Sequence, residues 1–347
     1  MKCKILSAYL SAFSLVGACS VAAARDYIEV VGSSTVYPFA TSVAEKFGKS
    51  SRFKTPKIEA TGSGGGLKLF CKGVGVQYPD ITNSSRRIKK NEYQMCQRNG
   101  VTDIVEVLIG YDGIAFANSK KMPQLQLTRR DIYLALAKDV PNPDGSANFV
   151  ANPYQRWSDI NPALPASRIE VLGPPPTSGT RDAFVELALE GGCKSFDWIA
   201  ALKKSDKGLF KQRCHTVRED GFYIEAGEND NLIVNKLEAN PSAFGVFGFS
   251  FLDQNADIVQ GSMIDGYDPT FESIASGDYS VSRPLYFYVK KAHVGIVPGI
   301  EGYLRKFTSE SSWGEEGFLA EKGMIPLDDE KRRAVRKAVR SLQRLEM

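Results

Sequence analysis

The sequence predicts an α/β protein of two lobes, each built on a mainly parallel sheet flanked by helices. Three observations lead to this fold class. Short β-branched runs alternate with helical segments over the first hundred residues, an arrangement that favours parallel strands. The apolar run at 105–119 is long enough for two strands or for one strand that crosses between domains. Strand patterns at 244–252 and 282–290 then return the chain, so that both of its ends build one lobe around an inserted second lobe.

Length and composition fit this arrangement. The 347 residues suffice for two domains, and 43% hydrophobic residues can fill a sizeable core. The net charge is +4 and no long basic block interrupts the middle of the chain, which disfavours nucleic acid as a partner. We expect a monomer in which residues 25–115 and 250–347 form lobe I, with a C-terminal surface helix, and residues 116–249 form lobe II.

Residues 1–24 have the pattern of an export signal. Two lysines precede an apolar stretch of small residues that ends in three alanines. We expect cleavage after Ala24 and a periplasmic location, with a lipidated anchor at Cys19, in the run VGAC, as the alternative. No later stretch has the roughly 18 uninterrupted apolar residues that a membrane span needs.

Four cysteines follow the signal, and an even number is typical of disulfides in an oxidising compartment. They fall as two local pairs, Cys71 with Cys96 and Cys193 with Cys214, and we expect these pairs to be bonded although four cysteines permit three connectivities. A zinc site is the alternative, but the chain has no C-x-x-C spacing, and His215 is the sole histidine near a cysteine.

The strand patterns end in loops rich in hydroxyl groups. Runs at 27–33, 57–63 and 80–85 each finish in small polar residues before a helical segment, and GPPPTSGT at 173–180 does so before RDAFVELALE. Loops at the carboxyl ends of parallel strands line the binding crevice of such folds. The free amides and the positive dipole end of each following helix favour an anion.

One such loop is ordinarily a helix cap, but four of one pattern predict a cage of donors for a compact oxyanion. Arg86 and Arg181 stand at the ends of two of these loops and could add bidentate, charge-assisted bonds.

Known enzyme motifs are absent from the sequence. Leu67 stands where G-x-G-x-x-G requires its third glycine, and neither a P-loop nor a G-x-S-x-G elbow occurs. The only histidines, His215 and His293, are not near a motif that would activate a serine. We therefore expect a binding protein without catalytic residues, metal or cofactor.

The runs GSST at 32–35, TGSGGG at 61–66, ITNSSR at 81–86 and TSGTRD at 177–182 together resemble the periplasmic phosphate-binding proteins of Pst-type ABC transporters. More broadly, the chain resembles the type II periplasmic binding proteins from about residue 27 to residue 290. GENDN at 227–231, followed by GVFGFSF, also matches.

The resemblance implies that the chain closes on inorganic phosphate between its lobes and delivers it to a membrane permease. The anion ligands that it implies are Ser34, Thr35, Ser63, Gly64, Ser85 and Arg86 from one lobe, and Ser178, Gly179, Thr180 and Arg181 from the other.

Two departures from the family pattern concern selectivity. Well-known members carry an aspartate after the third-loop serine, where this chain has Arg86, and an arginine shortly before S-G-T, where it has Pro174–Pro176. The carboxylate that accepts the phosphate proton must then come from elsewhere, and Asp112 and Asp182 are the candidates. Asp182 has a second interpretation, as a residue that stabilises its own helix N-terminus. The alternatives for function are a binder of sulfate, molybdate or tungstate, a secreted phosphatase, and a surface adhesion or scavenging protein.

Overall fold

The first lobe is built from three strand–loop–helix units, as the sequence predicts. The computed structural model describes residues 25–227 and 230–347. Strand β1 (Glu29–Gly32) pairs in parallel with β2 (Lys57–Ala60) on one side and with β3 (Ile81–Ser84) on the other. The helices that follow these strands are α1 (Tyr37–Ser50), α2 (Ser63–Phe70) and α3 (Lys90–Arg98). The predicted signal segment, with Cys19 and Ala24, lies outside the described residues, as do Glu228 and Asn229 of the GENDN run.

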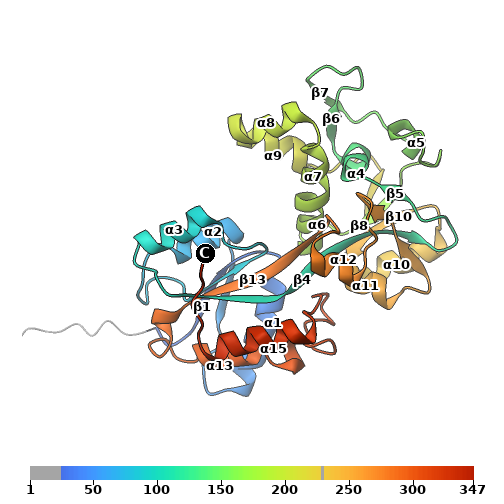
Figure 1. The fold of residues 1–347 in the computed structure, drawn as a ribbon. Coiled ribbons are helices and arrows are strands. Elements are labelled where there is room, and N and C mark those ends of the chain that lie inside the picture. Colours follow the sequence, from blue (N-terminus) through green and yellow to red (C-terminus); the bar gives the residue numbers. More distant parts are fainter. Residues whose placement is uncertain (1–24, 228–229) are drawn as a thin grey trace, which may run out of the picture.

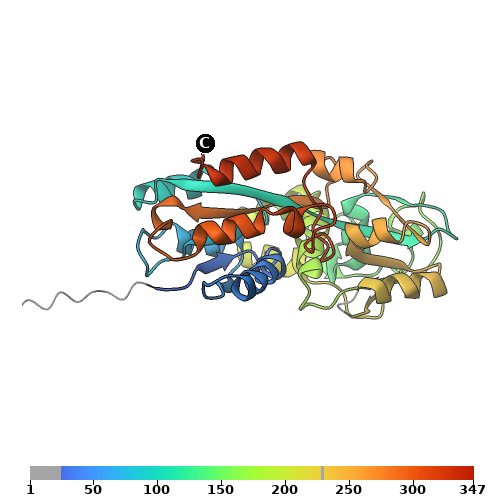
Figure 2. The ribbon, with the colours of Figure 1, turned by 90° about the horizontal axis from the view of Figure 1, so that it is seen from below.

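Two long strands join the lobes. The apolar run at 105–119 forms a single strand, β4 (Ile104–Ser119), and β13 (Ser282–Lys290) runs antiparallel to it, from Ile104 opposite Lys290 to Gly113 opposite Ser282. From Ile114 onward β4 pairs instead with β10 (Phe244–Gly248). Both views show β4 running from one lobe into the other (Figures 1 and 2). The run is therefore one crossing strand and not two separate ones.

The second lobe has its own parallel strands. β8 (Val171–Gly173) lies between β10 and β9 (Tyr223–Glu225), and all three are parallel, as the fold prediction requires. Three short helical segments follow one another without a break, α6 (Gly179–Phe184), the π-helix η1 (Val185–Leu189) and α7 (Glu190–Cys193). The other elements of this lobe are β5 (Gln126–Leu127), α4 (Arg129–Leu136), β6 (Asp139–Pro141), β7 (Phe149–Ala151), α5 (Trp157–Ile160), α8 (Asp197–Ser205), α9 (Lys207–His215), α10 (Asp230–Ala239), α11 (Phe249–Gln254), β11 (Val259–Gly261) and β12 (Met263–Ile264).

The chain enters the first lobe again through β13. β11 pairs with the end of β4 at Ser119, and β12 pairs with β5, so both belong with the second lobe. We therefore propose a second lobe boundary near β13 in place of the one at 249/250. The remaining elements are α12 (Phe271–Ser276), η2 (Lys291–His293), α13 (Ile300–Phe307), α14 (Glu310–Trp313) and α15 (Asp329–Arg340). α15 lies beside α13 (Figure 1) and contacts both α13 and β4. Most of its charged residues are exposed, as expected of a surface helix.

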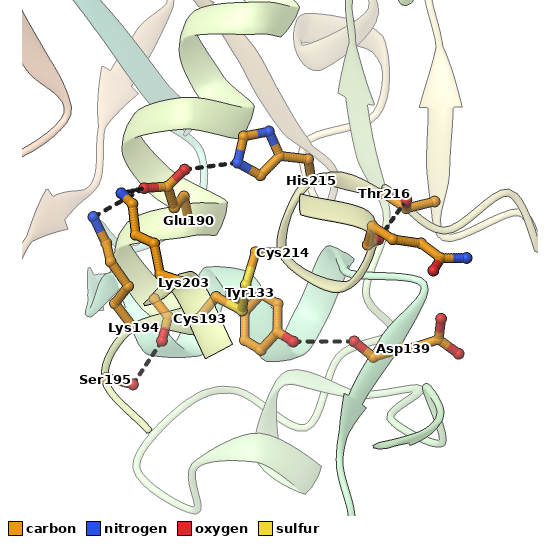
Figure 3. Close-up of a disulfide and its surroundings, with 12 residues drawn as sticks. Tyr133, Asp139, Glu190, Cys193, Lys194, Ser195, Lys203, Cys214, His215 and Thr216 are labelled. Carbon is orange, nitrogen blue, oxygen red and sulfur yellow. Dashed lines mark hydrogen bonds and ion pairs between the residues drawn. A yellow bond between two sulfur atoms is a disulfide. The ribbon is translucent and has the colours of Figure 1, made fainter. Parts of the chain in front are cut away.

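The cysteines form the two local pairs. Cys71 is bonded to Cys96, which ties the end of α2 to α3, and Cys193 is bonded to Cys214, which ties α7 to α9. Beside the second disulfide, the Glu190 carboxylate binds His215, Lys194 and Lys203 (Figure 3). His215 is thus part of a cluster of polar side chains around Glu190, on the helical stretch that continues α6.

Candidate functional site

A cavity of about 340 Å³ lies where the two lobes meet. Six residues that the sequence singles out line it. Two come from the loop after β1, three from the N-cap and first two residues of α6, and one from the crossing strand β4. These six are Ser34, Thr35, Asp112, Ser178, Gly179 and Thr180. The other lining residues are Tyr37, Pro38, Phe39, Thr177, Gly248, Phe251, Lys322 and Gly323. Two loops 140 residues apart in sequence thus form one site, and Lys322 adds a positive charge at its wall.

The first loop is shaped by a close approach of backbone to backbone. Gly32, the last residue of β1, has a φ of 133°, and a Cβ there would lie 2.1 Å from the carbonyl oxygen of Asn83. A Cβ at Gly66 would in turn lie 2.4 Å from the Cα of Gly32, so α2 packs directly on the end of β1. Only glycines fit at these two positions. They set the turn from which Ser34 and Thr35 reach the cavity.

The S-G-T loop meets the first loop across the cavity. A Cβ placed at Gly179 would lie 3.9 Å from the carbonyl oxygen of Ser34 and from the Cα of Thr35. Ser178 caps α6, because its hydroxyl oxygen accepts a hydrogen bond from the amide of Thr180 at 3.2 Å. The hydroxyl hydrogen of Ser178 is then still available to an anion. Gly179 and Thr180, the first two residues of α6, line the same cavity, and the positive end of a helix dipole favours negative charge there.

Arg181 supports this loop and does not line the cavity. Its guanidinium donates from Nη1 to the carbonyl oxygen of Pro174 at 3.1 Å and lies 4.3 Å above the ring of Tyr223. The hydroxyl of Tyr223 donates to the same carbonyl at 2.9 Å. Arg181 is a buried residue, 9% exposed, whose guanidinium contacts the proline-rich turn. Its role as an anion ligand stays a prediction.

The other predicted ligands form a second cluster, on the first lobe, that does not line the cavity. The hydroxyl oxygen of Ser63 accepts from the amide of Ser85 at 3.0 Å and lies 3.0 Å from the Ser85 hydroxyl. Arg86 binds Glu92 with both of its terminal nitrogens, at 2.7 and 2.9 Å. A Cβ at Gly64 would lie 3.8 Å from Nη2 of Arg86. The structure thus divides the ten predicted ligands into a group at the cavity, this cluster at the start of α2 and in the loop after β3, and Arg181.

Sequence reasoning missed Arg283, the cation that links the groups at the cavity. It lies on β13 opposite Asp112, and its residue is 7% exposed. Its Nη2 donates to the hydroxyl oxygen of Thr35 at 2.5 Å and its Nε to Asp112 at 3.2 Å, while Nη1 binds Glu186 at 2.6 Å. One side chain therefore joins the first loop, the crossing strand and the second lobe. A charged residue near the start of the strand pattern SRPLYFYVK was the available signal.

Both candidate proton acceptors have pKa values raised above the ordinary value of an aspartate. Burial raises the pKa of Asp112, and the positive charge of Arg283 opposes this shift only in part. Burial and the neighbouring Glu186 raise the pKa of Asp182, against the opposing effects of Arg283 and of a hydrogen bond with Ser34. A carboxylate with a raised pKa is a stronger base, and both therefore suit an anion that still carries a proton.

The amino-acid sequence matches one known protein family over most of its length. The family described as the PBP superfamily domain matches residues 18–311, which is most of the chain. This chain belongs to the PBP superfamily. The two lobes, the crossing strands and the cavity between them are consistent with that membership.

Two known proteins are similar in sequence to this chain over most of its length. Protein SphX of Synechococcus elongatus is 27% identical over 283 residues, which cover 78% of this chain and 72% of that protein. Phosphate-binding protein PstS of Staphylococcus saprophyticus is 28% identical over 301 residues, which cover 83% of this chain and 78% of that protein. Both alignments extend over most of each protein.

A solved structure supports the fold. The crystal structure of a "possible phosphate binding protein" from Planctomyces limnophilus superposes with a TM-score of 0.72 at 24% identity, over 92% of this chain and 99% of that one. Within residues 25–227 and 230–347, the helices are too short or too polar to span a membrane.

Proposed function

We propose that this protein binds inorganic phosphate between its lobes and passes it to the permease of an ABC transporter. The observation that carries the proposal is the cavity where hydroxyl groups and helix-start amides of both lobes meet beside Asp112 and Arg283. One relative supports the choice of ligand. The protein from Staphylococcus saprophyticus, which aligns with most of this chain, is named a phosphate-binding protein.

The hydrogen bonds of the site prepare two hydroxyl groups to donate. Thr35 accepts from Arg283, so the hydrogen of its hydroxyl is directed elsewhere, and Ser178 is in the same position because it accepts from the amide of Thr180. The amide of Gly179 and the hydroxyl of Thr180 add donors at the start of α6. Each such donor to a charged ligand contributes about 1.5–3 kcal/mol.

Selectivity for phosphate requires an acceptor. At neutral pH phosphate carries a proton that it can donate, whereas sulfate is fully deprotonated. Asp112 lines the cavity, whereas Asp182 lies in the first turn of α6, outside the cavity lining. The pKa of each is raised, and we propose that one of the two accepts that proton. A buried carboxylate would repel sulfate at a cost of several kcal/mol, because neither group would then have a donor.

We further propose that the protein acts in the periplasm as a monomer and catalyses no reaction. Support for export comes from the signal pattern at residues 1–24 and from the two disulfides, which are typical of oxidising compartments. No bond needs to be made or broken for the hinge closure of two lobes on an anion.

Calorimetric titration of the mature protein tests the proposal. We expect phosphate to bind with micromolar or tighter affinity, and sulfate, molybdate and tungstate to give no heat. Tight binding of sulfate or molybdate without phosphate would assign another oxyanion, and turnover of a chromogenic phosphate ester would identify a phosphatase. Absence of any phosphate binding by the folded protein would refute the proposal.

A further inference from the structure

Glu186 holds the cation of the site from the opposite lobe. It is the second residue of the π-helix η1, and π-helical turns within α-helices often occur at functional sites. Its carboxylate Oε2 lies 2.6 Å from Nη1 of Arg283. The side chain of Glu186 is 56% exposed and that of Arg283 is 7% exposed, so the carboxylate approaches a buried cation from the solvent side.

The three partners of Arg283 differ in how easily they could be replaced. Asp112 is its cross-strand neighbour, with a side chain that is 13% exposed, and Thr35 belongs to the fixed turn after β1. Glu186 comes from a different lobe and keeps more than half of its side chain in water. A carboxylate in that position can exchange for another oxyanion at small desolvation cost, because its hydration is largely retained.

The negative charge of Glu186 itself weakens anion binding beside Arg283. Asp112, Asp182 and Glu186 give three carboxyl groups around one arginine, and their repulsion opposes the approach of a further anion. The charge of Glu186 reaches its neighbours, because it contributes to raising the pKa of both Asp112 and Asp182. Removal of Glu186 from Arg283 would therefore free a donor and lower the negative charge beside it.

We propose that Glu186 is an internal competitor for the anion: its carboxylate occupies Nη1 of Arg283 and has to yield this nitrogen to an oxygen of the ligand. The inference rests on the proposed function and deepens it, because it names the residue that limits the affinity of the site. It also reverses the usual expectation for a charged residue at a binding site, since loss of the Glu186 charge strengthens binding.

The test is phosphate calorimetry on Glu186→Gln, which removes the charge and keeps the shape. We expect phosphate to bind roughly tenfold more tightly than to the wild type, as loss of an exposed ion pair and of one repelling charge implies. The matched control is Glu238→Gln, which removes the same charge from an exposed residue of α10 in the same lobe, with an expected change below about twofold. Arg283→Lys keeps the positive charge but loses the planar guanidinium with its several N–H donors. In this background, Glu186→Gln should hardly change the affinity for phosphate.

The outcomes separate this inference from the proposed function. If the wild type binds phosphate and Glu186→Gln binds it equally or less tightly, the inference is wrong and Glu186 is a bystander or a ligand. If Glu186→Gln and Glu238→Gln tighten binding alike, a general charge effect replaces the specific competition. If Glu186→Gln does not fold, as judged by its melting temperature, Glu186→Asp replaces it in the test. Aspartate keeps the charge but is too short to hold the contact with Arg283, so this variant should bind phosphate more tightly than wild type. If wild type and all variants fail to bind phosphate while they remain folded, the proposed function itself fails.

Discussion

Replacement of Arg283 by methionine should destabilise the protein through the carboxylate that it leaves behind. Removal of one partner of a buried ion pair costs about 3–5 kcal/mol. The lower end applies here, because the Asp112 side chain is 13% exposed and the Nε–Oδ2 distance is 3.2 Å. The contact with Glu186 adds little, since that side chain is 56% exposed. We therefore expect the free energy of unfolding to fall by about 3 kcal/mol at neutral pH.

The pH dependence of this loss follows from Asp112. Burial already raises the pKa of Asp112, and without Arg283 it should rise further. A carboxyl group whose pKa is higher in the folded than in the unfolded protein costs no stability below both values, and its cost grows as the pH rises toward the folded value. The difference between Arg283→Met and wild type should thus shrink to about 1 kcal/mol near pH 4, where the lost bond to Thr35 is the main remaining effect.

Urea denaturation at about pH 4 and about pH 8 measures both quantities, with Asp112→Asn as the companion variant. In an Asp112→Asn background, Arg283→Met should cost only about 1 kcal/mol at either pH, since no charge is left unpaired. A loss below about 1 kcal/mol at pH 8, or an equal loss with and without the Asp112 carboxylate, would refute the reasoning.

Three further predictions concern ligands, selectivity and the disulfide. Thr180→Val should weaken phosphate binding by about 1–3 kcal/mol and leave the melting temperature unchanged, because it removes one donor to a charged ligand; unaltered affinity in calorimetry would count against the S-G-T loop as a ligand. Asp182→Asn and Asp112→Asn should differ in sulfate binding, since only loss of the true proton acceptor admits sulfate, and a titration in which neither variant binds sulfate would show that the acceptor lies elsewhere. Replacement of Cys193 and Cys214 by alanine should lower the free energy of unfolding by about 3 kcal/mol, as expected for a loop of 21 residues, and an unchanged denaturation midpoint would contradict this.

Periodicity predicted the fold class, and cysteine spacing favoured, among three possible connectivities, the one that the structure has. Each unit of the first lobe combines a β-branched run with a hydroxyl-rich loop and a helix, and these local signals fix the order of elements. The run at 105–119 could not be resolved between one strand and two, because continuous apolar sequence is compatible with both. The pairing with β13 and then β10 decides it, and pairing partners are a tertiary property.

The site was predictable where backbone chemistry determines it and not where side chains from distant elements meet. Ser34, Thr35 and the S-G-T segment line the cavity, and local sequence singled them out because helix starts and glycine turns have local signatures; their role as anion ligands stays a prediction. Arg181 has the spacing of an anion ligand, yet Pro174 and Tyr223 capture its guanidinium. Arg283 carries no local signature, since its role depends on the β4–β13 register that places it opposite Asp112.

The crossing strands connect anion binding to the relative position of the lobes. β4 changes its partner from β13 to β10 between Gly113 and Ile114, and Gly110, which has a φ of 156°, lies in the same stretch, beside a register shift in β13. Asp112 lies between these two glycines and faces Arg283. Irregular pairing and glycines lower the cost of bending at this point. The guanidinium of Arg283 contacts both lobes, because it binds Thr35 in the first lobe and Glu186 in the second. An anion that exchanges for Glu186 would therefore alter the contact between the lobes at the position where the strands bend most easily, so that one arginine can couple ligand recognition to closure.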